Sequence, residues 1–117
     1  MPKALPVIDM TAPVCCTPVA SGPLSDADAL EVAMRLKALA DPARVKIVSL
    51  LFSSGEETSG GLAAALELSE STVSHHLGQL RKAGLLISDR RGMNVFHRAK
   101  PDALQALCVV LDPNCCT

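Results

Sequence analysis

The chain has 117 residues, of which 49% are hydrophobic, and this is enough to fill the core of one compact domain. Aromatic residues make up only 2%, which argues against a protein that binds single-stranded nucleic acid by stacking bases on aromatic rings. The formal net charge is −1, yet residues 69–100 contain six Lys or Arg against two acidic residues, a local balance of +4. A basic segment in an otherwise acidic chain favours contact with phosphate groups.

No run of about 18 apolar residues is available to span a membrane, and the first residues do not lead into an apolar signal core. We therefore expect a cytoplasmic protein without a membrane partner. Five cysteines in such a reducing compartment, an odd number, are not the pattern of a disulfide framework. Ligands, sensors or small core residues explain them better.

Residues 1–24 contain five prolines separated mainly by small residues, and this composition predicts an extended N-terminal arm. Ser25 is a suitable N-cap for a helix that runs to about Leu39. This helix has two apolar stripes on different sides, so one stripe can face the core while the other needs a partner, which we interpret as a dimer surface. The stripes consist of Leu30, Ala33 and Met34 and of Val32, Leu36 and Leu39.

Asp41 as an N-cap, followed by Pro42 at the first helical position, predicts a second helix through about Phe52. After a loop, residues 59–67 are expected to form a short third helix, although two consecutive glycines weaken its start. A turn at residues 68–69 leads into the next helix, which gives a helix-turn-helix.

The fourth helix is marked at both ends, by Ser69 as N-cap and by Gly84 as the expected left-handed residue just past its end. Its apolar stripe of Val73, Leu77 and Leu80 is expected to pack. The opposite face carries hydroxyls, an imidazole, an amide and a lysine, the groups that contact base edges and phosphates. We therefore interpret it as a DNA recognition helix rather than an ordinary solvated helix. The expected DNA contacts on it are Ser69, Ser71, Thr72, Ser74, His75, Gln79 and Lys82.

Residues 85–89 and 93–98 predict a β-hairpin whose turn contains Arg90 and Arg91. Two arginines at such a turn would reach phosphates or the minor groove beside the recognition helix, unless they form an ordinary solvated turn. We count both among the expected DNA contacts.

Pro101 opens a last helix, to about Leu111, that is apolar nearly all round and is therefore expected to pair with another subunit. The predicted fold is mainly α with a small β-hairpin. It has an arm at residues 1–24, a DNA-binding and dimerisation domain at 25–111, and a Cys-containing tail at 112–117.

Four motifs carry a family resemblance: Leu-Lys-Ala-Leu-Ala-Asp-Pro-Ala-Arg, Leu-Ser-Glu-Ser-Thr-Val-Ser-His-His-Leu, Leu-Arg-Lys-Ala-Gly-Leu and Arg-Arg-Gly, which begin at residues 36, 68, 80 and 90. In this order they resemble the ArsR–SmtB family of bacterial metal- and metalloid-responsive repressors, over roughly residues 25–111. The resemblance implies a winged helix-turn-helix, dimeric through its first and last helices. It also implies a repressor rather than an enzyme, which binds double-stranded operator DNA until an inducer releases it.

The sequence lacks two inducer sites that are common in that family. The Cys-x-Cys of many arsenic and cadmium sensors would fall near Thr58 and Gly60, and the last-helix zinc site needs histidine, whereas this helix offers only Asp102. Some similar proteins instead carry an arm Cys-Cys that binds arsenite together with a third thiol, often from the other subunit. The cysteines available here are Cys15, Cys16, Cys108, Cys115 and Cys116.

Thiolates select soft ions, and trivalent arsenic or antimony favours three sulfurs, while cadmium or zinc favours about four ligands. We expect As(III) as the inducer, with Sb(III), Cd(II) or Zn(II) as alternatives. Cys108 shares a stripe of the last helix with Leu104 and Leu111, so it is either a core residue or a ligand.

The three histidines are not expected to form a metal site. Neighbouring residues on a helix point apart, so His75 is expected to face DNA while His76 contacts the core. His97 stands alone in the hairpin and is expected to be structural. Two alternatives stay open for the protein: a redox sensor that forms disulfides between arm and tail, and a thiol enzyme such as an arsenate reductase. The sequence contains neither a Cys-x-x-Cys nor a phosphate-cradling glycine loop that would support the enzyme hypothesis.

Overall fold

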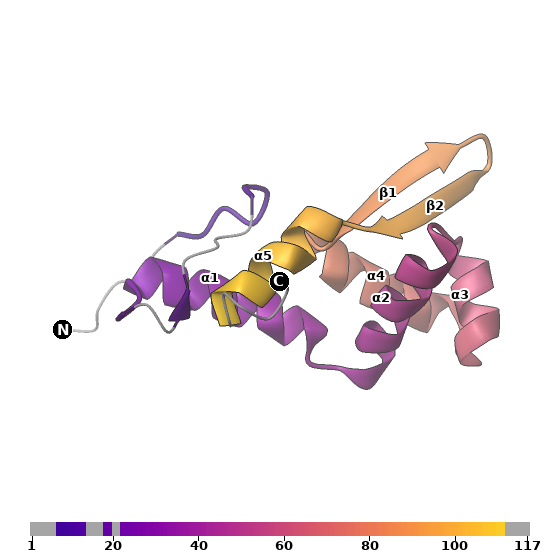
Figure 1. Cartoon of the computed structure of the whole chain (residues 1–117). Coiled ribbons are helices and arrows are strands. Elements are labelled where there is room, and N and C mark those ends of the chain that lie inside the picture. The colour runs from indigo at the N-terminus through magenta and orange to yellow at the C-terminus, as the bar shows by residue number, and fades with distance from the viewer. Residues whose placement is uncertain (1–6, 14–17, 20–21, 112–117) are drawn as a thin grey trace.

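The computed structural model describes residues 7–13, 18–19 and 22–111. In this part of the chain the elements are α1 (Asp26–Leu39), α2 (Pro42–Ser54), α3 (Ser59–Leu66), α4 (Glu70–Lys82), β1 (Leu86–Arg91), β2 (Asn94–Ala99) and α5 (Pro101–Leu111). Figure 1 shows α2, α3 and α4 gathered on one side of the β1–β2 hairpin, whose open end lies next to α5. The predicted mainly α fold with a small β-hairpin is confirmed.

The first four helices begin where a polar side chain caps them. In each case the cap accepts a hydrogen bond from a backbone N–H of the first turn, at 2.8–3.2 Å. In α2, Pro42 follows its cap at the first helical position, as predicted. The predicted ends are less accurate, since α2 continues to Ser54 and α3 ends at Leu66. The caps are Ser25, Asp41, Thr58 and Ser69.

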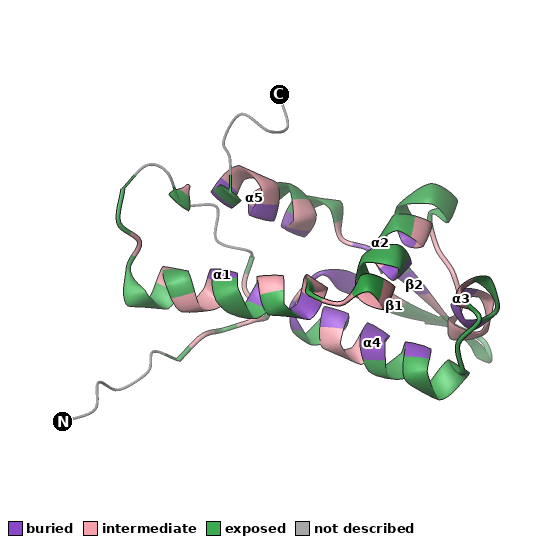
Figure 2. Ribbon diagram, turned by 90° about the horizontal axis from the view of Figure 1, so that it is seen from below, coloured by how far each residue is buried: buried purple, intermediate pink, exposed green. Residues whose placement is uncertain are grey.

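The core lies where α2, α3 and α4 meet the base of the hairpin and α5 (Figure 2). The stripe of α4 that was predicted to pack, Val73, Leu77 and Leu80, is at most 1% exposed. Burying a side chain of this size contributes about 1.5–3 kcal/mol, so this stripe fixes α4 firmly against the domain. The remaining face of α4 is left to the surface.

The hairpin register corrects one prediction. Arg90 and Arg91 are not in the turn but in β1, where they pair with Val95 and Asn94. The turn consists of residues 92–93, with φ of 63° at Gly92, the pattern of a two-residue turn that matches strand twist. Because successive side chains of a strand point to opposite faces, the two arginines face different surroundings.

The two helices expected to form a dimer surface retain exposed apolar residues. On α1, Val32 is buried, while Ala33 and Met34 are exposed. On α5, Leu107 lies in the core and Leu111 is exposed. No helix in the described part of the chain is long and apolar enough to cross a bilayer.

Candidate nucleic-acid interface

The exposed face of α4 carries the polar residues that the sequence singled out. Ser71, Thr72, Ser74 and His75 are exposed, Lys82 is exposed at the last turn, and Gln79 is half-buried. Glu70 is the one acidic residue of the helix and lies in its first turn. The face therefore offers neutral donors and acceptors along its middle and positive charge at its end.

Hydroxyl groups at the start of α4 are ordered by hydrogen bonds. The Ser69 hydroxyl accepts from the Thr72 N–H at 3.2 Å, donates to Thr72 Oγ1 at 2.8 Å, and lies 3.2 Å from Ser71 Oγ. Ser69 thus holds the helix start, while Ser71 and Thr72 keep hydroxyl lone pairs or protons for an outside partner.

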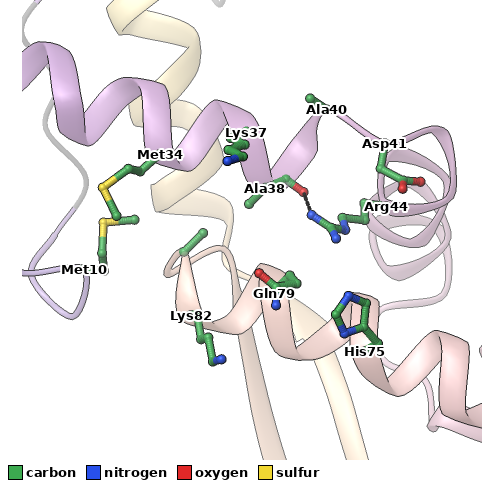
Figure 3. A pocket seen from close by; sticks show the side chains of 11 residues that line it. Met10, Met34, Lys37, Ala38, Ala40, Asp41, Arg44, His75, Gln79 and Lys82 are labelled. Carbon is green, nitrogen blue, oxygen red and sulfur yellow. Dashed lines mark hydrogen bonds between the residues drawn. The ribbon is translucent and has the colours of Figure 1, made fainter.

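A cleft of about 730 Å³ opens beside the exposed face of α4, between it, the end of α1 and the start of α2 (Figure 3). Three basic residues and one acidic residue line it, and the acidic one, Asp41, accepts from the Ala43 N–H as the cap of α2. This excess of positive charge favours an anion over a cation. The polar lining comprises Lys37, Asp41, Arg44, His75, Gln79 and Lys82.

Arg44 holds the walls of this cleft together. Its Nε donates to His76 Nδ1 at 3.1 Å, and its Nη1 donates to the Ala38 carbonyl at 3.3 Å. Since His76 is 9% exposed, the predicted core contact of this histidine is confirmed. The role of Arg44 was missed, because a backbone carbonyl as a partner leaves no pattern in the sequence.

The β1–β2 hairpin, residues 86–99, is called the wing. Its two arginines, Arg90 and Arg91, differ in their partners. Arg91 forms two hydrogen bonds with the Glu56 carboxylate, at 2.7 and 2.8 Å, and its Nε lies 3.2 Å from Asp89 Oδ2. The guanidinium also lies 4.8 Å from the Phe96 ring centre. Hydrogen bonding from Arg91 lowers the pKa of Glu56 below its usual range. Arg91 thus ties β1 to the segment between α2 and α3.

The Arg90 side chain is exposed and has no hydrogen bond or ion pair among the residues that the structure describes. Of the two wing arginines, it is therefore the one whose guanidinium is available to an outside anion.

His97 links the wing to two helices from a buried position. It is 4% exposed, its Nε2 lies 3.2 Å from Ser59 Oγ, and its Nδ1 lies 2.8 Å from Ser88 Oγ. Arg81 of α4 donates to the same Ser88 hydroxyl at 3.1 Å. Burial, and then the positive charge of Arg81, lowers the pKa of His97. The predicted structural role of this histidine is confirmed.

Four of the five candidate thiol ligands, Cys15, Cys16, Cys115 and Cys116, lie outside the described residues. Cys108 is half-buried on α5 and is disulfide-bonded, so in this structure it is neither the reduced core residue nor the thiolate ligand that the sequence allowed. Within the described ranges, no three His, Cys, Asp or Glu side chains are grouped to hold a metal ion.

Comparison with known proteins agrees with this geometry. Residues 41–88, which run from the cap of α2 into β1, match the family model described as bacterial regulatory protein, arsR family. The biofilm growth-associated repressor of Agrobacterium fabrum is 37% identical over 76% of this chain and 75% of its own length. The chain belongs to the ArsR family.

Other relatives extend the comparison. The arsenic resistance transcriptional regulator ArsR1 of Pseudomonas putida is 42% identical over 59% of this chain, and the match spans about half, 54%, of that protein. A homodimeric winged helix-turn-helix DNA-binding domain from Mycobacterium bovis, a possible ArsR-family regulator, is 30% identical with a TM-score of 0.63, covering 76% of this chain and 85% of that one. As an ArsR-family winged helix, the chain is a transcriptional regulator and not an enzyme.

Proposed function

We propose that this ArsR-family protein is a repressor that binds operator DNA as a homodimer and leaves it when trivalent arsenic binds to cysteine thiolates. The observation that carries the DNA-binding part is the exposed face of α4, with its hydroxyls, imidazole and amide beside a basic cleft. The similarity to an arsenic resistance regulator and the two Cys-Cys pairs support the inducer.

On DNA, the middle of α4 enters the major groove. Base edges are contacted by its hydroxyls, His75 and Gln79, while phosphates bind to Lys82 and to Lys37 across the cleft. Arg90 reaches a phosphate beside the groove, and Arg91 supports the wing from which Arg90 projects. The proposed DNA contacts are Ser69, Ser71, Thr72, Ser74, His75, Gln79, Lys82 and Arg90, together with Lys37, whereas Arg91 is proposed to act indirectly through its pairing with Glu56.

A dimer places two copies of α4 on successive major-groove half-sites about 34 Å apart. The homodimeric relative from Mycobacterium bovis supports this state. The exposed apolar residues of α1 and α5, such as Met34 and Leu111, supply the surface for it.

As(III) takes three thiolates from Cys15, Cys16, Cys108, Cys115 and Cys116; Sb(III) shares this preference, and Cd(II) or Zn(II) would take four ligands. Cys108 can act as a ligand only after its disulfide bond has been reduced, because the sulfur that binds As(III) must be a thiolate. The same observation favours one second candidate, a repressor released by oxidation of these thiols.

The test is fluorescence anisotropy of the reduced protein on DNA from its own promoter, titrated with arsenite and with cadmium. Arsenite is expected to weaken binding about 10- to 100-fold, within the usual range of allosteric coupling, and the double variant Cys15→Ser/Cys16→Ser is expected to lose this response. Cys108→Ser decides whether the third thiol is a ligand.

Four other outcomes would contradict the proposal. Tight DNA binding that neither ion changes would refute the metalloid-sensing function. Release by cadmium alone would show that cadmium, and not arsenic, is the inducer. Release by peroxide in the absence of any metal would establish the oxidation sensor instead. Failure to bind promoter DNA at all would refute the proposal that the protein is a repressor of that promoter.

A further inference from the structure

Arg35, in the middle of α1, is a charged side chain with no exposed surface. A buried guanidinium destabilises the fold unless its N–H groups are paired, so the groups that it bonds indicate what Arg35 does in the structure. Its Nη1 donates to the Ala83 carbonyl at 2.6 Å, and its Nη2 donates to the Ala12 carbonyl at 3.2 Å. Its Nε lies 3.4 Å from the Glu31 carboxylate, one turn earlier in α1.

These partners belong to two segments that are otherwise far apart in the chain. Ala83 is the C-cap of α4, the recognition helix. Ala12 belongs to the arm segment, by which we mean residues 7–13. The planar fork of an arginine can bond two carbonyls at fixed positions at once, which a point charge such as lysine does not do. Arg35 therefore joins the arm segment to the end of α4.

The arm segment is folded so that it presents this carbonyl. The Asp9 carboxylate accepts hydrogen bonds from the backbone N–H and the hydroxyl of Thr11, and the Ala12 N–H donates to the Asp9 carbonyl at 3.3 Å. Met10 packs against the hydrophobic core. The segment is thus a small turn attached to the domain.

The residue that follows α4, Gly84, packs closely against the Arg35 guanidinium and the arm segment. Gly84 has a φ of 74°, and a Cβ atom there would lie 2.6 Å from Arg35 Nη1 and 3.1 Å from the Met10 carbonyl oxygen. Only glycine allows this approach. Arm segment, guanidinium and helix end are therefore packed so that one cannot shift without the others.

We propose that Arg35 is the positioning residue that couples the arm to the recognition helix. Cys15 follows Ala12 by three residues, a span of at most about 11 Å, so ligation at Cys15 and Cys16 displaces the Ala12 carbonyl. Arg35 transmits this displacement to the Ala83 carbonyl and to the turn that carries Lys82. The coupling rests on the proposed function, because it gives the arm thiols their effect on DNA binding.

The test variant is Arg35→Lys, which keeps the charge facing Glu31 but cannot bond both carbonyls. Operator affinity without inducer, and arsenite binding measured by thiolate–arsenic absorbance, are expected to stay within about threefold of wild type. The loss of operator affinity caused by arsenite is expected to shrink about 10-fold, the size of a typical coupling. A role in stability alone would leave this ratio unchanged, and an unchanged ratio would overturn the proposal.

Two further variants control the result. Arg44→Lys is the same exchange in an arginine that also bonds a carbonyl, but that of Ala38 and not one in the arm segment, and it is expected to keep the full arsenite response. Asp9→Ala removes the acceptor that shapes the arm turn. Because Asp9 is exposed, this variant folds even if Arg35→Lys does not, and it is expected to reduce the response in the same direction. A full response in Asp9→Ala would count against the coupling.

A reporter without arsenite separates this proposal from the inducer. The chain has no Trp or Tyr, so Met10→Trp gives fluorescence from the arm segment alone. Operator DNA is expected to shift the emission of this protein, and adding Arg35→Lys is expected to abolish the shift. If arsenite proves inactive while this dependence holds, the inducer is wrong and the coupling stands. If operator DNA leaves the emission unchanged, the coupling is wrong whatever the inducer.

Discussion

His97 holds three parts of the winged helix together through one buried imidazole, and this makes stability depend on pH. In the unfolded chain the ring binds a proton near pH 6.5, whereas burial lowers its pKa in the folded protein. Protons therefore favour the unfolded state. The contribution of His97 to the free energy of unfolding is complete above pH 6.5 and is lost as the pH falls through its folded pKa.

We expect the free energy of unfolding, measured by urea denaturation, to fall between pH 7.5 and 5.5 less steeply in His97→Asn than in wild type. At pH 7.5 this variant is expected to be less stable by about 1–3 kcal/mol, since it loses buried hydrogen bonds. Ser74→Asn, on the exposed face of α4, is the control and is expected to keep the wild-type slope, because it removes no titratable group. Equal slopes for His97→Asn and wild type would contradict the assignment.

Single residues also show where sequence reasoning stops. The structural role of His97 and the core contact of His76 could be predicted, because an isolated or inward-facing histidine is marked by its position on a strand or helix. Arg35 could not, since its partners are backbone carbonyls up to 48 residues away and any residue type supplies a carbonyl. Only the fold brings these groups together.

The starts of the helices could be predicted from the sequence, because each start depends on a local capping residue. The ends of α2 and α3 and the register of the hairpin were predicted less well, since packing and turn geometry decide them. The register matters for function because it separates the roles of Arg90 and Arg91. The sequence placed both in the turn, where they would have acted alike.

The wing yields a matched pair of variants, Arg90→Gln and Arg91→Gln. Arg90 has no partner among the described residues, so its loss is expected to lower operator affinity about 3- to 10-fold and to reduce the slope of log affinity against log salt by about 1 per protomer. Arg91 is paired with Glu56, so its loss is expected to speed hydrogen exchange in β1 and β2 with little change in slope. A reduced slope in Arg91→Gln alone would reverse the assignment.

In the proposed homodimer, affinity for an operator depends on two copies of α4 binding together. Linking two binding modules raises the apparent affinity by about 100-fold or more when their spacing matches that of the sites. In this chain the surface available for such linkage is the exposed apolar side of α1 and the end of α5, where Met34 is 41% and Leu111 is 55% exposed.

Ala33→Glu tests this surface, because Ala33 is exposed on α1 beside Met34 and a carboxylate there is harmless to a monomer but is buried without a partner in a dimer. Sedimentation equilibrium is expected to show a shift from twice the chain mass toward 12.2 kDa, and operator affinity is expected to fall at least 100-fold. Val45→Glu, a charge at an exposed apolar residue of α2, should change neither quantity. If Ala33→Glu remains a dimer while losing affinity, α1 contacts DNA instead of a second subunit.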